Sequence, residues 1–391
     1  MSQSLRSNFK PQAIDAGLIQ ALKERVTFSS ESECISNMAQ QTNAQRIFHA
    51  SQPLHPFFKR SVVTAHRDFD LALGGAEKVF LYTGRGPSTE SMHLGHLVPF
   101  LLTKYLHRLV FPQSPLVIQM ADDEKYLNSK SSLEDVKKYT DSNLRDILAL
   151  DFDKERTFLF KNTEYVQKMY PTVLRIQKSL TINAVSHTFG LEGSDCAGKF
   201  LFPAMQAAPC FAQCFDGLFN ISKSKWRALV PCALDQDPFF VLARQIAKKL
   251  NHSKPSILHC GYVPSLKNIS LKMSSSKPEH GVIFMTDSRE TIQKKIKGAH
   301  SGGHPTLEEF LKKGGNLSTD VPYQLLKYFL EDDEEYEEIG RKYVKAQISS
   351  GAIKSYTADL ISDVIQEWQE RRASIAPHDI EYMQSIRSIE K

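Results

Sequence analysis

The sequence predicts an α/β domain built on a parallel sheet, followed by a domain made only of helices. Two patterns carry this prediction. From about residue 60, short apolar runs alternate with helix-like stretches, and from about residue 287 the pattern is helical throughout. Buried strands that alternate with helices are typical of a parallel sheet covered on both faces. The 391 residues are enough for two or three domains, at roughly 150 residues per domain.

Five apolar runs are predicted to be the strands of this sheet: Val79–Tyr82, Leu116–Met120, Thr157–Phe160, Ala228–Pro231 and Ser256–His259. Helix-like stretches follow most of them: His96–His107, Leu133–Leu148 and Phe239–Leu250. Ligands bind such a sheet at the carboxyl ends of its strands. The residues just after each apolar run are therefore the first candidates for a functional site.

The first fifty residues differ from the rest in composition, because they are rich in Ser, Gln and Asn. Within them, residues 14–26 place apolar side chains roughly on one face of a helix, which predicts one amphipathic helix. Residues 29–45 have the composition of a loop or linker.

The C-terminal quarter is predicted to be helical and is acidic. Asp287 and Glu290 are predicted to cap its first helix, and apolar side chains between residues 360 and 368 mark one face of a long helix. Residues 296–391 hold 12 Lys or Arg and 17 Asp or Glu, whereas the preceding residues carry a net charge of +10. Either the basic part binds phosphates, or the two parts simply have differently solvated faces.

The overall composition is that of an ordinary soluble globular protein, with 41% apolar and 24% charged residues. It excludes disordered, collagen-like and coiled-coil chains. The six cysteines form no CxxC pair, so we expect reduced, mostly buried thiols, and the lone i, i+4 pair Cys210 and Cys214 predicts no metal site. The longest uncharged run, residues 200–215, is shorter than the roughly 20 residues that span a bilayer. We therefore expect no membrane segment, and a signal peptide is not predicted either.

The first candidate site follows the first apolar run, in the segments TGRGPS (residues 83–88) and MHLGH (residues 92–96). A helix that begins near His96 aims unpaired N–H groups at an anion. His93 and His96, three residues apart, can lie on one side of its first turn and donate to phosphate oxygens. The segment matches neither a Walker loop nor a dinucleotide-binding fingerprint.

The second candidate site is LKMSSSK, residues 271–277. A loop of lysines and small hydroxyl residues can fold over a phosphate chain, although alone it is equally compatible with an exposed polar loop. The HxGH and KMSSS segments lie about 180 residues apart. Together they resemble the HIGH and KMSKS signatures of class I aminoacyl-tRNA synthetases.

The amino-acid sequence between these two signatures narrows the resemblance to one family. The segments YTGRGPSTESMHLGH, VIQMADDEKYL, GKFLFPAMQAAP, PCALDQDPFF and LKMSSSKP resemble successive motifs of the eukaryotic-type, cytosolic tryptophanyl-tRNA synthetases. FFKRSVVTAHRDFD upstream, and AHSGGH and YFLEDDEEYEEI downstream, extend the resemblance over roughly residues 50–375. The chain departs from KMSKS at its fourth position, where Ser275 replaces lysine, as is usual in this branch. The resemblance does not identify which cation takes the place of this lysine.

The resemblance implies a fold and a division of the chain. We expect a Rossmann-like parallel-sheet catalytic domain of the HIGH/KMSKS class I type over residues 51–295, with residues 51–78 as a lead-in segment. An α-helical anticodon-binding domain is expected over residues 296–391. Residues 1–50 are expected to be a partly helical, partly flexible extension that is dispensable for adenylate formation except where it packs on the ATP side.

The implied reaction has two steps. Tryptophan reacts with ATP to give tryptophanyl-adenylate and pyrophosphate, and the tryptophanyl group then passes to the terminal ribose of tRNA(Trp). ATP is a substrate accompanied by Mg²⁺, with no prosthetic group and no metal bound by protein residues alone. The implied enzyme is a cytoplasmic homodimer without membrane contact.

The resemblance also assigns residues to these steps. The catalytic residues are expected to be His93, Gly95, His96, Lys272, Ser274, Ser275 and Ser276. ATP is expected to contact Thr83, Gly84, Arg85, His93, His96, Lys125, Lys272 and Met273. Tryptophan is expected to contact Tyr82, Gln119, Glu124, Gln206, Gln236 and Phe240. Asp332 and Asp333 are the candidates for contacts with anticodon bases, because carboxylates can accept hydrogen bonds from exocyclic amines.

Within the amino-acid pocket, Tyr82 and Gln119 are expected to meet the indole N–H, and Glu124, Gln206 and Gln236 the α-ammonium. Indole offers one N–H donor and no acceptor, so a selective pocket needs an acceptor aimed at that N–H. Buried glutamines can also simply tie neighbouring backbone groups together.

Three alternatives stay open at this point. A tyrosyl-tRNA synthetase shares the fold and both signatures, and a phenol could also use Tyr82 and Gln119. A nucleotidyltransferase of the HxGH superfamily, which makes a dinucleotide cofactor, does not explain the helical C-terminal domain. A non-catalytic tRNA-binding paralogue is disfavoured by the intact phosphate and pocket positions.

Overall fold

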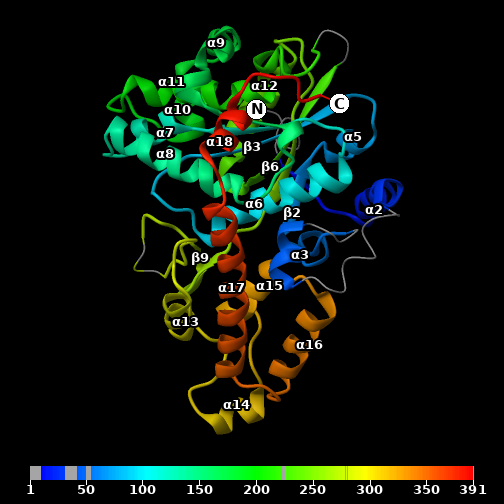
Figure 1. The fold of residues 1–391 in the computed structure, drawn as a ribbon, viewed down its shortest axis with the longest axis vertical. Coiled ribbons are helices and arrows are strands. Elements are labelled where there is room, and N and C mark those ends of the chain that lie inside the picture. Colours follow the sequence, from blue (N-terminus) through cyan, green and yellow to red (C-terminus); the bar gives the residue numbers. More distant parts are fainter. Residues whose placement is uncertain are drawn as a thin grey trace.

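The computed structural model describes residues 10–30, 42–49, 54–221, 225–277, 279 and 281–390. Figure 1 shows an elongated molecule, in which an α/β body continues at one end into a narrower helical part. The predicted order, an α/β body followed by helices, is confirmed.

A seven-stranded sheet runs through the body in the order β1-β2-β7-β6-β3-β4-β5. The strands are β1 (Gln12–Ala13), β2 (Val63–Arg67), β3 (Lys78–Arg85), β4 (Leu116–Met120), β5 (Thr157–Lys161), β6 (Trp226–Ala233) and β7 (Ser256–Cys260). The five strands from β7 to β5 are parallel, and all five were predicted. The remaining two, β1 and β2, extend the sheet in antiparallel fashion beyond β7. A separate hairpin consists of β8 (Pro264–Ser265) and β9 (Asn268–Lys272).

Two hydrophobic cores cover the two faces of the sheet. Successive side chains of a strand point to opposite faces. Accordingly, Val79 and Leu81 of β3 belong to one core, and Phe80 and Tyr82 belong to the other. Because both faces of these strands are buried, they appear in the sequence as continuous apolar runs.

The helices of the body are α2 (Ala16–Ser30), α3 (Asn43–His49), α4 (Pro56–Lys59), α5 (Phe69–Leu73), α6 (Leu94–Tyr105), α7 (Asp122–Asn128), α8 (Leu133–Leu148), α9 (Asn162–Ser179), α10 (Ile182–Phe189), α11 (Ala197–Ala207) and α12 (Asp237–Ala247). A π-helical turn (Leu106–Val110) continues α6, and short 3-10 turns occupy Lys154–Arg156, Ala208–Cys210, Ala212–Phe215 and Leu234–Gln236. The predicted helix over residues 133–148 has the bounds of α8, which begins with a capping box between Ser132 and Asp135.

The helical part consists of α13 (Arg289–Lys297), α14 (Leu307–Lys313), α15 (Val321–Phe329), α16 (Asp333–Val344) and α17 (Ser350–Ala373), and the last helix, α18 (Pro377–Gln384), lies on the α/β body. The predicted cap of α13 was wrong by one residue. Ser288 is the N-cap and accepts a hydrogen bond from the Thr291 amide. Asp287 instead accepts from the Phe284 amide and forms an ion pair with Lys295.

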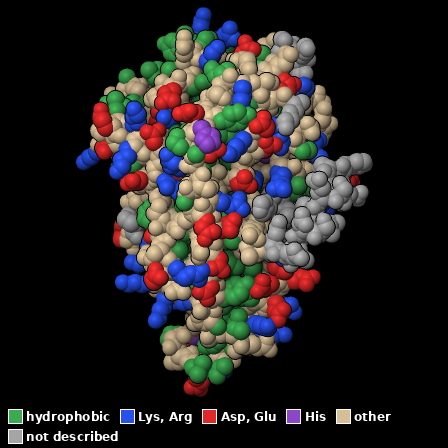
Figure 2. Space-filling view, viewed as in Figure 1, with side chains coloured by type: hydrophobic (Ala, Val, Ile, Leu, Met, Phe, Trp, Pro, Cys, Tyr) green, Lys and Arg blue, Asp and Glu red, His purple; other side chains and the backbone are tan. Residues whose placement is uncertain are grey.

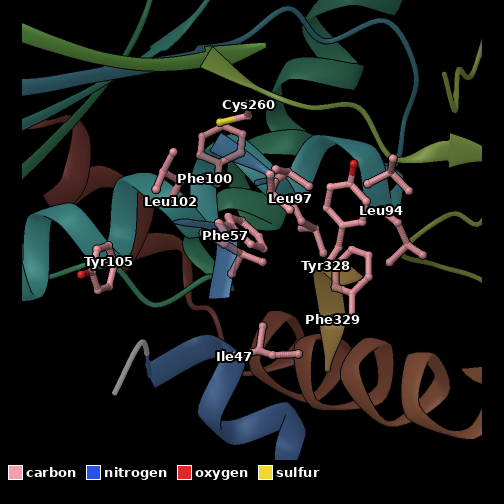
Figure 3. Close-up of a cluster of buried hydrophobic side chains, with 14 of the residues drawn as sticks. Ile47, Phe57, Leu94, Leu97, Phe100, Leu102, Tyr105, Cys260, Tyr328 and Phe329 are labelled. Carbon is pink, nitrogen blue, oxygen red and sulfur yellow. The ribbon is translucent and has the colours of Figure 1, made fainter. Parts of the chain in front are cut away.

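The helical part shares a core with the body. Figure 3 shows Phe57 and Phe100 of the body together with Tyr328 and Phe329 of α15, and Ile47 of α3 lies beside them. The long helix α17 is buried along its predicted apolar face and packs on α13 and α15. This shared core holds the helical part against the body.

Both ends of the chain pack on the α/β body. β1 pairs with β2, and α2 buries Leu18, Leu22 and Val26. At the other end, α18 packs on β5, and Ile389 is buried in the second core. Residues 31–41 of the predicted loop lie outside the described residues.

Four of the five cysteines in the described part of the chain are buried thiols, and all five are free. Over the same residues, no helix is both long and apolar enough to cross a membrane.

Candidate active site

The carboxyl ends of three neighbouring strands bring the predicted pocket residues together. The parallel register places Gly84 of β3 beside Gln119 of β4. The helix α7 follows β4 directly and carries Glu124, and a short turn after β6 carries Gln236. A Cβ on Gly84 would lie 3.0 Å from the Gln119 backbone oxygen, so glycine permits this close approach.

The first helical turn after β3 is closed by its own histidines. His93 is the N-cap of α6, and its Nδ1 accepts a hydrogen bond from the Gly95 amide at 3.1 Å. Nδ1 of His96 accepts from the His93 amide, also at 3.1 Å. The two rings stack with centroids 3.5 Å apart. The helix therefore begins at Leu94, two residues before the predicted start at His96, because His93 caps it.

Burial, nearby charges and these hydrogen bonds determine the protonation of the His93 and His96 rings. Burial, together with the nearby charges of Arg85 and Lys272, lowers the pKa of His93 to about 3. Burial also places the pKa of His96 well below its ordinary value. Each ring is therefore neutral at pH 7, and because each Nδ1 accepts a hydrogen bond, the proton is on Nε2. Both histidines can thus donate one N–H without carrying charge.

The KMSSS loop and the residues that follow it lie against this turn. Leu94 donates its amide hydrogen to the Ile283 carbonyl at 3.2 Å, and Met285 donates to the Met92 carbonyl at 2.9 Å. A Cβ on Gly95 would lie 3.8 Å from the Cβ of Met273. The two signature segments are thus neighbours in space, as the resemblance implies.

Lys272, the last residue of β9, is held by two neighbouring side chains. Its Nζ lies 2.7 Å from Asp235 Oδ2 and 5.4 Å from the centre of the Tyr262 ring. Within the loop, the hydroxyls of Ser274 and Ser276 are 2.9 Å apart. The side chain of Lys272 remains half exposed.

Four of the six predicted amino-acid pocket residues, Tyr82, Gln119, Gln206 and Phe240, form one buried group, whereas Glu124 and Gln236 are only half-buried. The Tyr82 hydroxyl donates to Gln119 Oε1 at 2.6 Å, and Gln206 Nε2 donates to the Tyr82 hydroxyl at 3.1 Å. The ring of Phe240 lies edge-on to Tyr82 with centroids 5.9 Å apart. Burial raises the pKa of Tyr82, so its phenol stays protonated and can serve as donor or acceptor.

Arg85 supplies a buried cation beside the histidines. Its Nε donates to Asn143 Oδ1 at 3.2 Å, whereas Nη2 is buried without a hydrogen-bond partner. Burial lowers its pKa to about 10, which still leaves the guanidinium charged at pH 7. An unpaired guanidinium nitrogen suits an anionic ligand, since buried donors are normally satisfied. Nearby, Lys125 pairs with Glu124 at 3.1 Å.

Asp146 lies behind the site, and no role was predicted for it from the sequence. Asp146 of α8 is fully buried, and its Oδ2 accepts a hydrogen bond from the Met92 amide at 3.1 Å. Its Oδ1 accepts from Arg372 Nε of α17 at 2.6 Å, and its backbone oxygen accepts from the Trp368 indole. Asp146 thus ties the residue before His93 to the long helix of the helical part.

Replacing Asp146 with alanine is expected to lower the free energy of unfolding by about 3–5 kcal/mol, because a buried ion pair loses one partner. Urea denaturation would measure this loss. Asp363→Ala is the matched control, since Asp363 forms an exposed ion pair between α17 and α13 and such pairs contribute about 0–1 kcal/mol. Equal losses in the two variants would contradict the anchoring role of Asp146.

The two anticodon candidates have partners within the chain. Asp332 is the N-cap of α16 and accepts a hydrogen bond from the Glu335 amide at 3.0 Å. Asp333 forms ion pairs with Lys59 at 2.5 Å and Arg60 at 2.7 Å. The prediction that either one contacts an anticodon base stays a prediction.

Comparisons with known proteins agree with this geometry. A sequence model of the family "tRNA synthetases class I (W and Y)" matches residues 76–366. The cytoplasmic tryptophan–tRNA ligase of Dictyostelium discoideum is 41% identical over 342 residues, which are 86% of this chain and 85% of that relative. The human cytoplasmic tryptophan–tRNA ligase is 39% identical, over 86% of this chain and 72% of the relative.

Solved structures give the same result. The tryptophanyl-tRNA synthetase of Plasmodium falciparum superposes with a TM-score of 0.85 at 38% identity, covering 99% of this chain and 96% of that one. The Encephalitozoon cuniculi enzyme, solved bound to tryptophan, superposes with a TM-score of 0.83 at 36% identity, covering 98% and 97%. The relatives are named for tryptophan, which favours the tryptophan assignment over the tyrosyl alternative. The chain therefore belongs to the class I tRNA synthetases for tryptophan and tyrosine, and within them to the tryptophan–tRNA ligases.

Proposed function

We propose that this chain joins tryptophan to ATP and then to tRNA(Trp) with the residues assembled at the carboxyl ends of β3, β4 and β6. The observation that carries this proposal is that Met273 of the KMSSS loop lies against the capped histidine turn, which follows the strand that carries Tyr82 beside Gln119. In the first step, the tryptophan carboxylate attacks the α-phosphorus of ATP. The bond from that phosphorus to the bridging oxygen breaks, and pyrophosphate leaves.

This step needs orientation and charge compensation more than proton transfer. We assign the Nε2–H groups of His93 and His96 to phosphate oxygens, with the unpaired guanidinium nitrogen of Arg85 beside them. Lys272 and the serines of the KMSSS loop are assigned to the triphosphate, with Lys125 as a further cation. The remaining ATP contacts are Thr83, Gly84 and Met273. Support comes from the neutral, oriented histidines and from the two cations whose charges lower their pKa values.

For tryptophan, we assign the indole N–H to Tyr82 and Gln119, and the pocket wall to Phe240. A carbonyl oxygen has two lone pairs. Gln119 Oε1 accepts one hydrogen bond from Tyr82, which leaves a second acceptor site for the indole N–H. The α-ammonium is assigned to Glu124, Gln206 and Gln236.

Mg²⁺ is proposed to enter with ATP, as a counter-ion of the substrate. Over the residues that the structure describes, no three His, Cys, Asp or Glu side chains gather in a way that could hold a metal ion. Mg²⁺ commonly takes its ligands from substrate phosphates and water. The phosphate oxygens are therefore expected to hold it, and its charge would add to that of Arg85 and Lys272.

The helical domain, residues 296–391, is proposed to bind the anticodon, with Asp332 and Asp333 as candidates for base contacts. Over the face in Figure 2, acidic and basic side chains are interspersed along the helical part. This mixture favours selective contacts there over a broad cationic surface. The net charge of +10 on the preceding residues would supply the salt-sensitive attraction to the tRNA backbone.

A homodimer in the cytoplasm is proposed as the working form. Large apolar side chains are exposed on three helices that pack together: Tyr170 and Leu174 of α9, Ile182 of α10 and Leu201 of α11. Exposed apolar groups of this kind are common at interfaces between subunits. The molar mass of the protein in solution, measured by sedimentation equilibrium, tests this assembly.

The direct test of the function is ATP–pyrophosphate exchange with tryptophan and tyrosine offered separately. Exchange is expected with tryptophan, followed by charging of tRNA(Trp) when that tRNA is added. Exchange with tyrosine alone would overturn the proposal. Exchange that depends on neither amino acid would instead favour the nucleotidyltransferase alternative.

A further inference from the structure

A line of hydrogen bonds runs from Tyr82 in the pocket through two buried amides to the half-buried Asp123. The Tyr82 hydroxyl donates to Gln119 Oε1 at 2.6 Å. Gln119 Nε2 donates to Asn162 Oδ1 at 2.8 Å, and Asn162 Nδ2 donates to Asp123 Oδ1 at 2.8 Å. Gln119 is fully buried and Asn162 is 1% exposed. Four elements contribute one residue each: β3, β4, α9 and α7.

The carboxylate of Asp123, at the far end from Tyr82, fixes the direction of every bond in this line. A primary amide has one donor end and one acceptor end of nearly the same shape, whereas an ionised carboxylate only accepts. Asp123 therefore turns the NH₂ group of Asn162 toward itself and leaves Asn162 Oδ1 facing Gln119. That oxygen in turn holds the NH₂ group of Gln119, so that Gln119 Oε1 faces Tyr82.

Local backbone geometry keeps the carboxylate in place. Asp123 Oδ1 also accepts a hydrogen bond from the Glu124 amide at 2.9 Å. Both residues lie in the first turn of α7, immediately after the strand that carries Gln119. Asn162 is the first residue of α9, directly after the neighbouring strand β5. The sheet itself thus brings the three groups into line.

We propose that Asp123 and Asn162 are positioning residues, which hold Gln119 with its carbonyl oxygen toward the indole N–H and thereby set the selectivity of the pocket for an N–H donor. This inference rests on the proposed role of Gln119 in binding tryptophan. If either amide turned over, two donors or two acceptors would face each other inside a buried site. The pocket would then present an NH₂ group to the indole N–H.

The test uses a tryptophan analogue in which sulfur replaces the indole N–H, β-(benzothiophen-3-yl)alanine. Its shape is nearly that of tryptophan, but it has no ring donor. The ratio of kcat/KM for tryptophan to kcat/KM for this analogue is measured by ATP–pyrophosphate exchange. The unsubstituted protein is expected to prefer tryptophan by about 10²-fold or more, because the site is built to bind an N–H.

Asn162→Leu keeps the branched shape and the number of heavy atoms of the side chain and breaks the line. We expect the preference for tryptophan to fall at least about tenfold, through a higher KM for tryptophan and an unchanged KM for ATP. Asp123→Leu is the second variant, because it removes the acceptor for Asn162 Nδ2, whereas an asparagine would be held by the Glu124 amide with its oxygen still toward Asn162. Thr172→Val, on the same helix and also buried, is the control and is expected to keep the full preference.

The outcomes separate this inference from the proposed function. If Gln119→Met loses the preference while Asn162→Leu and Asp123→Leu keep it, the positioning role is wrong and the pocket assignment stands. If Gln119→Met also keeps the preference, the assignment of Gln119 itself fails. If the Asn162 and Asp123 variants lose activity equally toward tryptophan and the analogue, their role is only structural and the inference is overturned.

A change of pH provides an independent readout. Burial raises the pKa of Asp123 to about 6, the Asn162 hydrogen bond opposes this, and the charges of Asp122 and Glu124 on α7 add to it. The Tyr82 phenol on β3 also faces this charge. Below pH 6 the protonated carboxyl can donate as well as accept, so the preference for tryptophan is expected to fall between pH 7.5 and 5.5. A preference that stays constant over this range in the unsubstituted protein would contradict the role of Asp123.

Discussion

Replacing Lys272 with alanine is expected to lower the rate of tryptophan-dependent ATP–pyrophosphate exchange by about 10²- to 10³-fold, or 3–4 kcal/mol in the activation free energy. The reason is that the paired histidines are neutral. With the pKa of His93 near 3, the histidines donate hydrogen bonds but do not compensate the triphosphate charge. In the proposed site, that task falls to Lys272, Arg85 and Lys125.

The measurement is kcat at saturating tryptophan and ATP, with tryptophan binding checked by calorimetry. We expect kcat to fall and the affinity for tryptophan to change little, because Lys272 lies near the histidines and is held by Asp235 at the mouth of the site. Lys277→Ala is the matched control from the same loop, with an exposed side chain. A loss of less than about tenfold is expected for it, since removal of a preorganised donor is what costs 10²-fold or more.

The comparison also addresses the lysine that is missing at Ser275. If Lys277→Ala is as damaging as Lys272→Ala, the second cation of the loop is Lys277. If only Lys272→Ala is damaging, the second cation is more simply Arg85, whose Nη2 is buried without a partner. A Lys272→Ala variant within about threefold of the parent rate would contradict the assignment of the loop to the triphosphate.

The parallel strands could be predicted because they are buried on both faces and therefore appear in the sequence as continuous apolar runs. β4 is buried at every position, and its predicted bounds are its observed bounds. β2 and β9 form no such runs, because their side chains alternate irregularly or are mostly exposed. The start of α6 was missed by two residues because histidine is an unusual N-cap, and nothing in the spacing signals its side-chain contact with Gly95.

The residues of the site also fall into some that could be predicted from the sequence and some that could not. Residues at strand ends were predicted, since a parallel sheet always gathers them at one edge. Asp146 and Asn143 were not, because their partners lie far away in the sequence, and Asn162 was missed although it directly follows β5. Asp146 contacts Met92, 54 residues earlier, and Arg372, 226 residues later. No local pattern encodes such contacts, which arise only when α8 packs between the histidine turn and α17.

Packing of the first fifty residues changes the expectation that they are dispensable. Leu22 and Val26 of α2 are completely buried, and Arg25 donates to the carbonyls of Leu73 and Val110. In α3, Asn43 donates to the Phe329 carbonyl and accepts from the Glu331 amide. These helices thus join the body to the helical part.

A chain that begins at residue 51 is accordingly expected to fold poorly. Among the described residues, it loses five large buried apolar side chains: Leu18, Leu22, Val26, Ile47 and Phe48. At about 1.5–3 kcal/mol for each fully buried side chain, their burial contributes about 8–15 kcal/mol before the entropy of ordering the segment is subtracted. That gross figure is comparable to the whole stability of a typical domain, about 5–15 kcal/mol. Thermal unfolding should show a melting temperature lowered by more than about 10 °C, or no cooperative transition.

The control is a chain that begins at residue 10, which keeps every described contact and is expected to melt like the parent. Exchange activity distinguishes a structural from a chemical loss. Because no residue assigned to tryptophan or ATP precedes Tyr82, truncated protein that remains folded at low temperature should still form adenylate. A shortened chain with unchanged melting temperature would show that α2 and α3 contribute little. A folded one without exchange activity would place part of the ATP site in these helices.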